Sequence, residues 1–371
     1  MLLGACYIRI LHVVPKYSPH VGGVEIVAQE LSKRLVKENH EVTVYTVDLK
    51  EELPNEQQID GVLVKRYRSI IGDPLYCPSP RFFWTMRNEN VDVIHAHNIH
   101  ILLTLLVVLF RKNGQKLLLQ PYYHRFGQSP LRNSLLKLYK YALNNVVFSR
   151  ADLVIANSVY EKRILCHDFP RFRNVILIPL GIDVDEIRAV KHDPVEPKRI
   201  LYVGALRRYK NVDKILNGFA WLLGKGDKNF KLVIVGEGSE YQSLTNLADN
   251  LGVNSFIEWK HGLSRQQLLH EFAKASVFIQ LSPLESFSIV VYEALLVGVP
   301  AVVLNFGAFA NLVKAGLAEG VNSLNPKEIA EALLKATRKT YTKISEGPNT
   351  FLNWKEYSGK IIKIYHRLLE R

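Results

Sequence analysis

Two glutamates, Glu285 and Glu293, stand in an otherwise apolar stretch at a spacing that can serve a sugar nucleotide. The periodicity predicts strands over residues 277–281 and 299–304 and a helix over 286–297 between them. Glu285 then precedes the helix, and Glu293 lies roughly two turns deeper. Carboxylates are good acceptors for vicinal hydroxyls, so the pair is suited to holding the hydroxyl groups of a sugar and a ribose.

The start of that helix offers a second feature, a set of free backbone N–H groups. A helix that begins at the carboxyl end of a parallel strand points these groups at the crevice where ligands of open α/β sheets bind. We therefore expect the N–H groups of Phe287, Ser288 and Ile289 to face a bound anion. The spacing alone leaves an alternative open, in which Glu285 is a first-turn acid favoured by the helix dipole and Glu293 an ordinary helix residue.

The run that starts at Glu285, E-S-F-S-I-V-V-Y-E-A-L-L-V-G-V-P-A-V-V, resembles the glutamate, seven residues, glutamate signature of the family 4 glycosyltransferases. The resemblance implies that Glu285 contacts hydroxyls of the donor sugar and that Glu293 contacts the nucleotide ribose. It also implies the GT-B fold, an α/β architecture of two doubly wound Rossmann-like domains facing across a cleft.

Length and composition fit two domains of ordinary size. The chain has 371 residues, of which 48% are hydrophobic, and strands alternate with helices in two halves. We expect an acceptor-side domain over residues 1–185, a linker over 186–198 and a donor-binding domain over 199–349. The C-terminal helix, within residues 350–371, is expected to cross back to the first domain.

Charge is distributed unevenly along the chain, whose formal net charge is +13. Residues 93–151 contain no Asp or Glu, and an amphipathic helix is predicted over 131–148 within them. The basic residues of this tract are Arg111, Lys112, Lys116, Arg125, Arg132, Lys137, Lys140 and Arg150. Such a tract can meet nucleic acid, anionic lipid or a phosphorylated substrate. No nucleic-acid-binding motif accompanies it, so we favour an anionic membrane surface.

Nothing in the sequence predicts a membrane-spanning segment. The longest apolar run, residues 101–110, is half the roughly 20 residues that a bilayer span needs. The opening residues 1–14 resemble a first strand rather than a signal peptide, because they lack a basic start. We therefore expect a cytoplasmic protein that binds peripherally at the cytoplasmic face of the membrane.

Several residues of the first half are candidates for the cleft. Gly22 and Gly23 follow the first strand, in a loop that the resemblance places near the donor phosphates and the acceptor, although a plain tight turn explains them as well. His95 and His97 form a His-x-His pair at the end of a strand. Such a pair can bind metal, but no third ligand is near in sequence, so we interpret it as structural, with His97 lining the cleft.

Two further positions concern the reacting centre and the metal requirement. The family usually has His where this chain has Tyr122, so either Tyr122 takes that place or His124 reaches in, and a solvent-facing loop histidine remains the alternative. Asp183 and Asp185 form an Asp-x-Asp, which in another glycosyltransferase class holds a divalent metal. Here we interpret it as a domain-boundary turn, and we predict neither a catalytic metal nor a cofactor.

The loop after the first strand of the second half carries three cations. The family usually has Arg where this chain has Ala205 and Lys where it has Lys210, and the two neutralise the donor diphosphate. Lys210 keeps that role by resemblance, and Arg207 or Arg208 can replace the missing guanidinium. A solvated basic loop is the alternative.

The resemblance, taken with these residues, implies a retaining, metal-independent hexosyltransferase that uses a nucleotide-diphosphate sugar and a sugar or lipid-linked acceptor. The residues expected to act in catalysis are Glu285, His124 and Lys210. Tyr122, Ala205 and Asn311 depart from the family pattern. These departures leave two alternatives, a non-catalytic sugar-nucleotide binding or scaffold protein and a sugar-nucleotide epimerase of the same fold.

Overall fold

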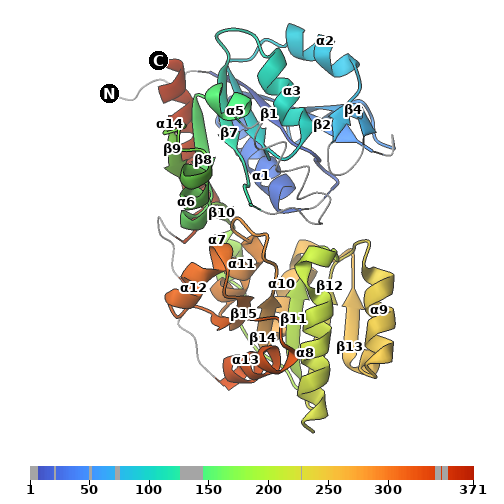
Figure 1. Ribbon diagram of the computed structural model, residues 1–371. Coiled ribbons are helices and arrows are strands. Elements are labelled where there is room, and N and C mark those ends of the chain that lie inside the picture. Colours follow the sequence, from blue (N-terminus) through green and yellow to red (C-terminus); the bar gives the residue numbers. More distant parts are fainter. Residues whose placement is uncertain are drawn as a thin grey trace. The chain divides into compact units, whose positions relative to one another are not determined.

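The computed structural model describes residues 7–20, 22–49, 52–71, 76–125, 145–226, 228–338, 344 and 350–371. The chain forms two compact units, each of which has a sheet with helices around it in Figure 1. The first unit comprises residues 1–181 and 348–371, and the second comprises residues 182–347. The division after Gly181 lies four residues before the predicted boundary.

The first unit is built on a sheet with the strand order β3-β4-β2-β1-β6-β7-β8-β9, to which β5 is added beside β4. β3 and β5 run antiparallel to β4, and the other neighbouring strands pair in parallel. The strands are β1 (Arg9–Val13), β2 (Glu41–Asp48), β3 (Glu56–Ile59), β4 (Val62–Ile71), β5 (Cys77–Pro78), β6 (Val93–His97), β7 (Lys116–Gln120), β8 (Leu153–Ala156) and β9 (Val175–Leu177). The helices are α1 (Gly23–Lys37), α2 (Arg81–Asn88), α3 (Leu102–Phe110), α5 (Asn145–Ser149), α6 (Val159–Asp168) and α14 (Trp354–Leu369).

Helix α14 belongs to the first unit, where it packs against α1. The short strand β17 (Leu352–Asn353) leads into it and pairs with β10 (Gly181–Ile182), and the backbone N–H of Leu352 donates to the carbonyl of Leu180 over 3.1 Å. The indole of Trp354 occupies the space that a side chain at position 181 would need, so only glycine fits there. The C-terminal residues therefore complete the first unit.

The second unit has an all-parallel sheet with the strand order β13-β12-β11-β14-β15-β16. Its strands are β11 (Lys198–Val203), β12 (Phe230–Val235), β13 (Ile257–Lys260), β14 (Val277–Gln280), β15 (Ala301–Leu304) and β16 (Glu319–Val321). Its helices are α7 (Val184–Arg188), η2 (Arg208–Lys210), α8 (Val212–Gly224), α9 (Tyr241–Asn250), η3 (Asn254–Phe256), α10 (Arg265–Lys274), α11 (Ile289–Val297), η4 (Gly307–Phe309), α12 (Ala310–Lys314) and α13 (Pro326–Arg338). This order is that of a Rossmann fold.

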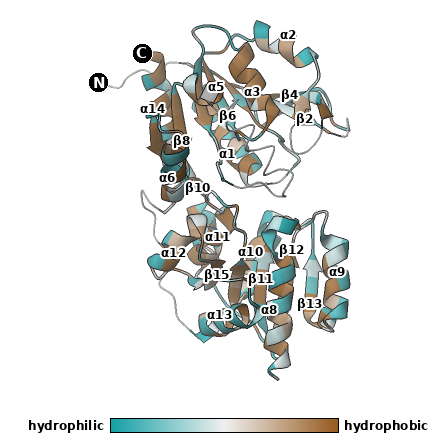
Figure 2. Ribbon diagram, in the orientation of Figure 1, coloured by the Kyte–Doolittle hydropathy of each residue, from teal (hydrophilic) through white to brown (hydrophobic). Residues whose placement is uncertain are grey.

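Hydropathy explains why these segments adopt these positions. In Figure 2 α3 is hydrophobic along its length, whereas α8 and α13 carry hydrophilic residues on one side and hydrophobic residues on the other. The buried sides of α8 and α13 pack together, and Ile329 fills the space that a side chain at Gly218 would need. Burying one apolar stripe of each amphipathic helix against a sheet is what drives a layered α/β domain to form.

The segment predicted as a linker is instead part of the second unit. Residues Val184–Arg188 form α7, and the residues after it follow the C-terminal end of α10. His192 Nε2 lies 2.8 Å from the carbonyl of Ala275, and the N–H of Asp193 donates to the carbonyl of Ala273 over 2.9 Å. These two hydrogen bonds to backbone carbonyls hold the segment on its own unit.

Among the described residues, no helix combines the length and the apolar character that crossing a bilayer requires.

Candidate functional site

The candidate donor site lies at the carboxyl ends of β11 and β14, which are neighbours at the centre of the second sheet. At this point the strand order changes direction, and the resulting crevice is where open α/β sheets bind ligands. Asn211 ties the two loops together, because its Nδ2 donates to the carbonyl of Leu281 over 2.8 Å. Asn211 adopts a left-handed backbone conformation, with φ of 57°, and ends η2 directly before α8.

Lys210 and Glu285 meet in this crevice. Lys210 Nζ donates to Glu285 Oε1 over 2.5 Å, and the two side chains are only 14% and 15% exposed. Burial alone would lower the pKa of Lys210, but the charge and hydrogen bond of Glu285 outweigh it, so the pKa of Lys210 lies above its ordinary value. The structure therefore brings together two residues that the sequence predicts for one site.

The loop that carries Lys210 is held by backbone contacts with the loop after β12. The N–H of Leu206 donates to the carbonyl of Glu237 over 2.8 Å. A side chain at Gly236 or Gly238 would overlap with backbone of the Lys210 loop, at Gly204 and Leu206 respectively. Glycine is needed at these two positions because the loops approach so closely.

The predicted replacement cations lie in the same loop. Arg208 is exposed and Arg207 is half-buried, and Ala205, where the family usually has Arg, is exposed. Tyr202 donates from its hydroxyl to the carbonyl of Ala205 over 3.1 Å, which fixes this part of the loop. Arg207 and Arg208 thus lie in the same loop as Lys210. Their binding to phosphate stays a prediction.

Helix α11 begins later than predicted, at Ile289 rather than Ser286. Ser288 occupies the N-cap position in a left-handed conformation, with φ of 79°, and its side chain makes no capping hydrogen bond. Phe287 is buried and stacks on Tyr292, with ring centroids 4.4 Å apart. Of the three residues expected to face an anion, Ser288 and Ile289 are therefore the N-cap and the first residue of α11, whose N–H groups have no partner inside the helix, and Phe287 precedes them.

Glu293 lies inside α11 and is nearly buried, with its side chain 7% exposed. Its Oε1 accepts a hydrogen bond from a terminal guanidinium nitrogen of Arg265, over 2.7 Å, and Arg265 Nε donates to Glu186 over 2.8 Å. Burial raises the pKa of Glu293, and Arg265 acts against that rise. Arg265 was not predicted as a site residue, and nothing in the sequence links it to an acid 28 positions later.

Three histidines cluster in the first unit. His12 at β1 and His95 and His97 at β6 are fully buried, and their ligand atoms lie within 4.8 Å of one another. His12 Nδ1 lies 2.9 Å from His97 Nε2, and His95 Nδ1 lies 2.8 Å from the hydroxyl of Tyr365. No third ligand is near His95 and His97 in sequence, but the fold brings His12 of the first strand close to both in space.

The histidine cluster is electrically neutral. Burial lowers the pKa of His12 to about 3 and the pKa values of His95 and His97 well below their ordinary value. Among the described residues, no carboxylate or thiolate joins the group. His12 contacts His97 and His95 contacts Tyr365 through one ring nitrogen each, and the structural role of His95 and His97 stays a prediction.

Tyr122 and His124 lie in the loop after β7. Tyr122 is buried, with a φ of 49°, and its ring centroid lies 6.2 Å from that of His97. His124 is half-buried, and its ring lies beside His100 with 4.4 Å between centroids. Gly22, which is half-buried, is the N-cap of α1, and exposed Gly23 is its first residue.

Glu161 is a buried residue that positions this loop and that the sequence did not reveal. Its two carboxylate oxygens accept the backbone N–H groups of Tyr123, over 2.5 Å, and Asn157, over 2.7 Å. It thereby joins the chain after β7 to the chain after β8. Burial raises the pKa of Glu161 to about 7, although the hydrogen bonds from Asn157 and Tyr123 oppose the rise.

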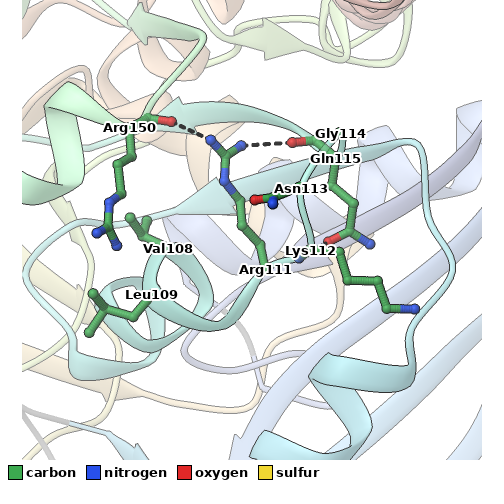
Figure 3. Close-up of a pocket in the computed structure, with 8 residues that line it drawn as sticks. All are labelled: Val108, Leu109, Arg111, Lys112, Asn113, Gly114, Gln115 and Arg150. Carbon is green, nitrogen blue, oxygen red and sulfur yellow. Dashed lines mark hydrogen bonds between the residues drawn. The ribbon is translucent and has the colours of Figure 1, made fainter.

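A basic pocket lies elsewhere in the first unit, between the end of α3 and the start of β7. Its lining residues are Val108, Leu109, Arg111, Lys112, Asn113, Gly114, Gln115 and Arg150. Figure 3 shows the Arg111 guanidinium donating to the carbonyls of Gln115 and Arg150, over 2.8 and 2.7 Å. Arg111 thus holds the pocket wall. The pocket lies at the amino end of β7, whereas ligands of parallel sheets bind at the carboxyl ends.

Asp183 and Asp185 lie at the first turn of α7. Asp183 is the N-cap residue, and its side chain accepts the N–H of Glu186 over 3.4 Å. The Asp-x-Asp pair therefore starts a helix just after the division between the units, and the predicted boundary turn is in fact a helix start.

Comparisons with known proteins agree with this geometry. The model of the Glycosyltransferase Family 4 matches residues 21–186, and that of the Glycosyl transferases group 1 matches residues 183–347. The N-acetyl-alpha-D-glucosaminyl L-malate synthase of Bacillus anthracis is 24% identical, over 80% of each chain.

A second relative and one solved structure extend the likeness. The GDP-mannose:cellobiosyl-diphosphopolyprenol alpha-mannosyltransferase of Komagataeibacter xylinus is 25% identical over 89% of this chain and 83% of its own. The structure of Anabaena Alr3699/HepE in complex with UDP and glucose has a TM-score of 0.71 at 17% identity, and covers 97% of this chain and all of its own. The latter shows a likeness of fold alone.

Glu161 predicts a pH dependence of stability. Its pKa is about 7 in the folded chain and about 4.3 when unfolded. Between these values the folded state binds the extra proton, so its stability falls as pH rises, by up to the order of 3 kcal/mol. Glu161→Gln should flatten this fall in the thermal unfolding midpoint of the first unit between pH 5 and pH 7.5. Glu331→Gln, at an exposed position, is the control and should leave the pH dependence unchanged. If the unfolding midpoint fell equally steeply with pH in the wild type and in Glu161→Gln, the assignment to Glu161 would be contradicted.

Proposed function

Because the chain belongs to the family 4 glycosyltransferases and has their GT-B fold, we propose that it is a retaining enzyme acting on a glycan or lipid-linked acceptor at the membrane surface. Its activity is glycosyl transfer from a nucleotide-sugar donor. The observation that carries the proposal is the pairing of Lys210 with Glu285 at the switch point of the second sheet.

Each part of the crevice has a proposed role toward the donor. Glu285 accepts hydroxyls of the transferred sugar, and Glu293 accepts hydroxyls of the ribose. Lys210, with Arg207 or Arg208, neutralises the diphosphate, aided by the N–H groups of the first turn of α11. Charge-assisted contacts of this kind are roughly twice as strong as neutral hydrogen bonds. They act on the charge that grows as the diphosphate departs.

The proposed reaction keeps the anomeric configuration. The bond from the sugar C1 to the diphosphate oxygen breaks, and the acceptor hydroxyl forms a new bond to C1 on the same face. The proton of the acceptor passes to an oxygen of the departing phosphate, so the nucleoside diphosphate leaves with it. His124 and Tyr122 are the proposed first-unit residues near the reacting centre, with His97, Gly22 and Gly23 as further cleft residues. No metal or cofactor takes part in this proposal.

The acid-free tract and one relative support the proposed membrane association. The Komagataeibacter xylinus relative is named for a diphosphopolyprenol acceptor, a lipid-linked diphosphate. Among the cations of the tract that the structure describes, Arg111 pairs with Asp152 over 3.2 Å and Arg125 pairs with Asp168 over 2.7 Å, and both acids lie outside the tract. The electrostatic field of the tract is therefore weaker than its number of basic residues alone would produce. Arg132, Lys137 and Lys140 lie outside the described residues, as does the predicted helix over 131–148 except for its end, which falls in α5.

We expect Glu285→Ala to lower turnover more than stability, because its hydroxyl contact positions the sugar for transfer. Glu293→Ala should instead raise the KM for the donor, since the ribose contact is made equally before and during reaction. Steady-state kinetics with a panel of nucleotide sugars would measure both. Folded variants that bind donor and turn over like the wild type would refute these roles.

Lys210→Ala should lower kcat/KM by about 30- to 150-fold, corresponding to roughly 2 to 3 kcal/mol of lost charge stabilisation. Lys214, in the first turn of α8, is 43% exposed and pairs with its neighbour Asp213, so Lys214→Ala is a matched control for the loss of a nearby cation. Equal effects of the two substitutions would remove Lys210 from the diphosphate site.

Activity is expected to survive EDTA, because cationic side chains and not a metal meet the diphosphate. If EDTA abolishes activity and manganese or magnesium restores it, the metal-independent mechanism is wrong. Asp183→Asn and His12→Ala then tell whether the Asp-x-Asp pair or the histidine cluster holds the ion.

Binding to anionic vesicles should occur at low salt and weaken as salt is added, because each near-surface Lys or Arg adds about 1 kcal/mol. Charge reversal at Arg132, Lys137 and Lys140 should weaken it further and leave donor hydrolysis unchanged. Vesicle flotation measures this, with neutral vesicles as the control. Equal binding to both lipids, or none at low salt, would contradict membrane association.

A further inference from the structure

We propose that Arg265 is a positioning residue for the donor ribose, acting through Glu293. This inference rests on the proposed role of Glu293. Arg265 is the first residue of α10, a helix whose start is fixed by a capping box between Ser264 and Gln267. The base of the Arg265 side chain therefore stands at a defined point beside α11, which α10 contacts.

The contacts of Arg265 divide it between two acids of different exposure. Its Nε meets Glu186 of α7, 37% exposed, and its terminal nitrogen meets Glu293 of α11, 7% exposed. Three separate helices are thus joined by one guanidinium. Because Arg is a rigid planar fork, holding two carboxylates at once also fixes the direction of each.

Glu293 depends on this contact more than Glu186 does. A carboxylate in the apolar interior of α11 loses water as a partner and tends to take up a proton, which would turn one acceptor oxygen into a donor. Two more acids, Glu186 and Asp183, act in the same direction. Arg265 supplies the opposing charge, so it keeps Glu293 an acceptor and leaves the second oxygen, Oε2, for a ribose hydroxyl.

The effect should therefore appear on the ribose and not on the whole nucleotide. The test measures the binding of UDP and of 2′-deoxy-UDP by calorimetry. If UDP does not bind, GDP and ADP are each compared with their 2′-deoxy forms instead. The wild type should prefer the ribonucleotide. Arg265→Gln should weaken ribonucleotide binding by about ten- to hundredfold, the range for a hydrogen bond to a charged group, and bring the ratio of the two affinities toward one. Arg265→Lys, which keeps the charge but not the fork, should lie between.

Arg199 of β11 provides a matched control, because it contacts an acid near the other end of α10. Arg199 also bridges two acids, Glu258 over 2.7 Å and Glu271 of α10 over 3.1 Å. Arg199→Gln should lower the unfolding temperature and leave the ratio of ribonucleotide to deoxynucleotide affinity unchanged. A general loosening of α10 would instead change that ratio in both variants and overturn the proposal.

A double-mutant comparison decides whether Arg265 works through Glu293. In the Glu293→Gln background, adding Arg265→Gln should produce no further loss of ribonucleotide affinity, because the residue it positions is already altered. Additive losses would overturn the proposal. A wild type that binds UDP and deoxy-UDP equally would overturn the ribose role of Glu293 itself. If the wild type and Arg265→Gln both prefer the ribonucleotide over the deoxynucleotide to the same extent, only the role of Arg265 would be overturned.

Discussion

The ion pair of Lys210 and Glu285 determines the polarity and the spacing of the candidate site. Each charge is largely removed from water, and each offsets the desolvation of the other. The pair forms only because β11 and β14 are neighbours and Asn211 holds their following loops at a fixed separation. In the proposed function, an entering donor replaces part of this contact with its own diphosphate and hydroxyls. A site built this way is kept polar and correctly spaced while it is empty, and the surrounding Rossmann sheet supplies the rigidity that this needs.

Much of the fold could be predicted from the sequence because its strands are short apolar runs separated by helix-length segments. The strand predicted over residues 277–281 matches β14 to within one residue at each end. The strand predicted over residues 299–304 matches β15 to within two residues. The start of α11 was missed by three residues, since no propensity rule anticipates Ser288 in a left-handed conformation. Charge and proline predicted a linker over residues 186–198. Residues 189–197 indeed form no helix or strand, and hydrogen bonds to carbonyls at the end of α10 place this segment on the second unit.

The site was predictable where function fixes spacing along the chain and not where the fold joins distant residues. Glu285 and Glu293 are eight positions apart, and the loop with Lys210 follows a recognisable strand. His12 could have been found from topology, because β1 and β6 are neighbours in a doubly wound sheet and register pairs His12 with His95. Arg265 and Glu161 carry no such signal. Each is an ordinary charged helix residue in sequence, and only burial of its partner reveals what it does.

The start of α11 shows how backbone conformation can keep a helix terminus available for a ligand. Ser158, Ser264 and Asn353 each cap a helix with a side-chain hydrogen bond to a backbone N–H. Ser288 has the same chemistry at α11 and makes no such bond, because its left-handed backbone, with φ of 79°, turns away from the usual extended capping conformation. A non-glycine residue in such a conformation costs on the order of 1 to 3 kcal/mol. The strain lies three residues from Glu285, where uncapped N–H groups and the dipole of α11 favour a negative charge. The first turn of α11 therefore lacks the side-chain cap that would compete with an anion for its N–H groups.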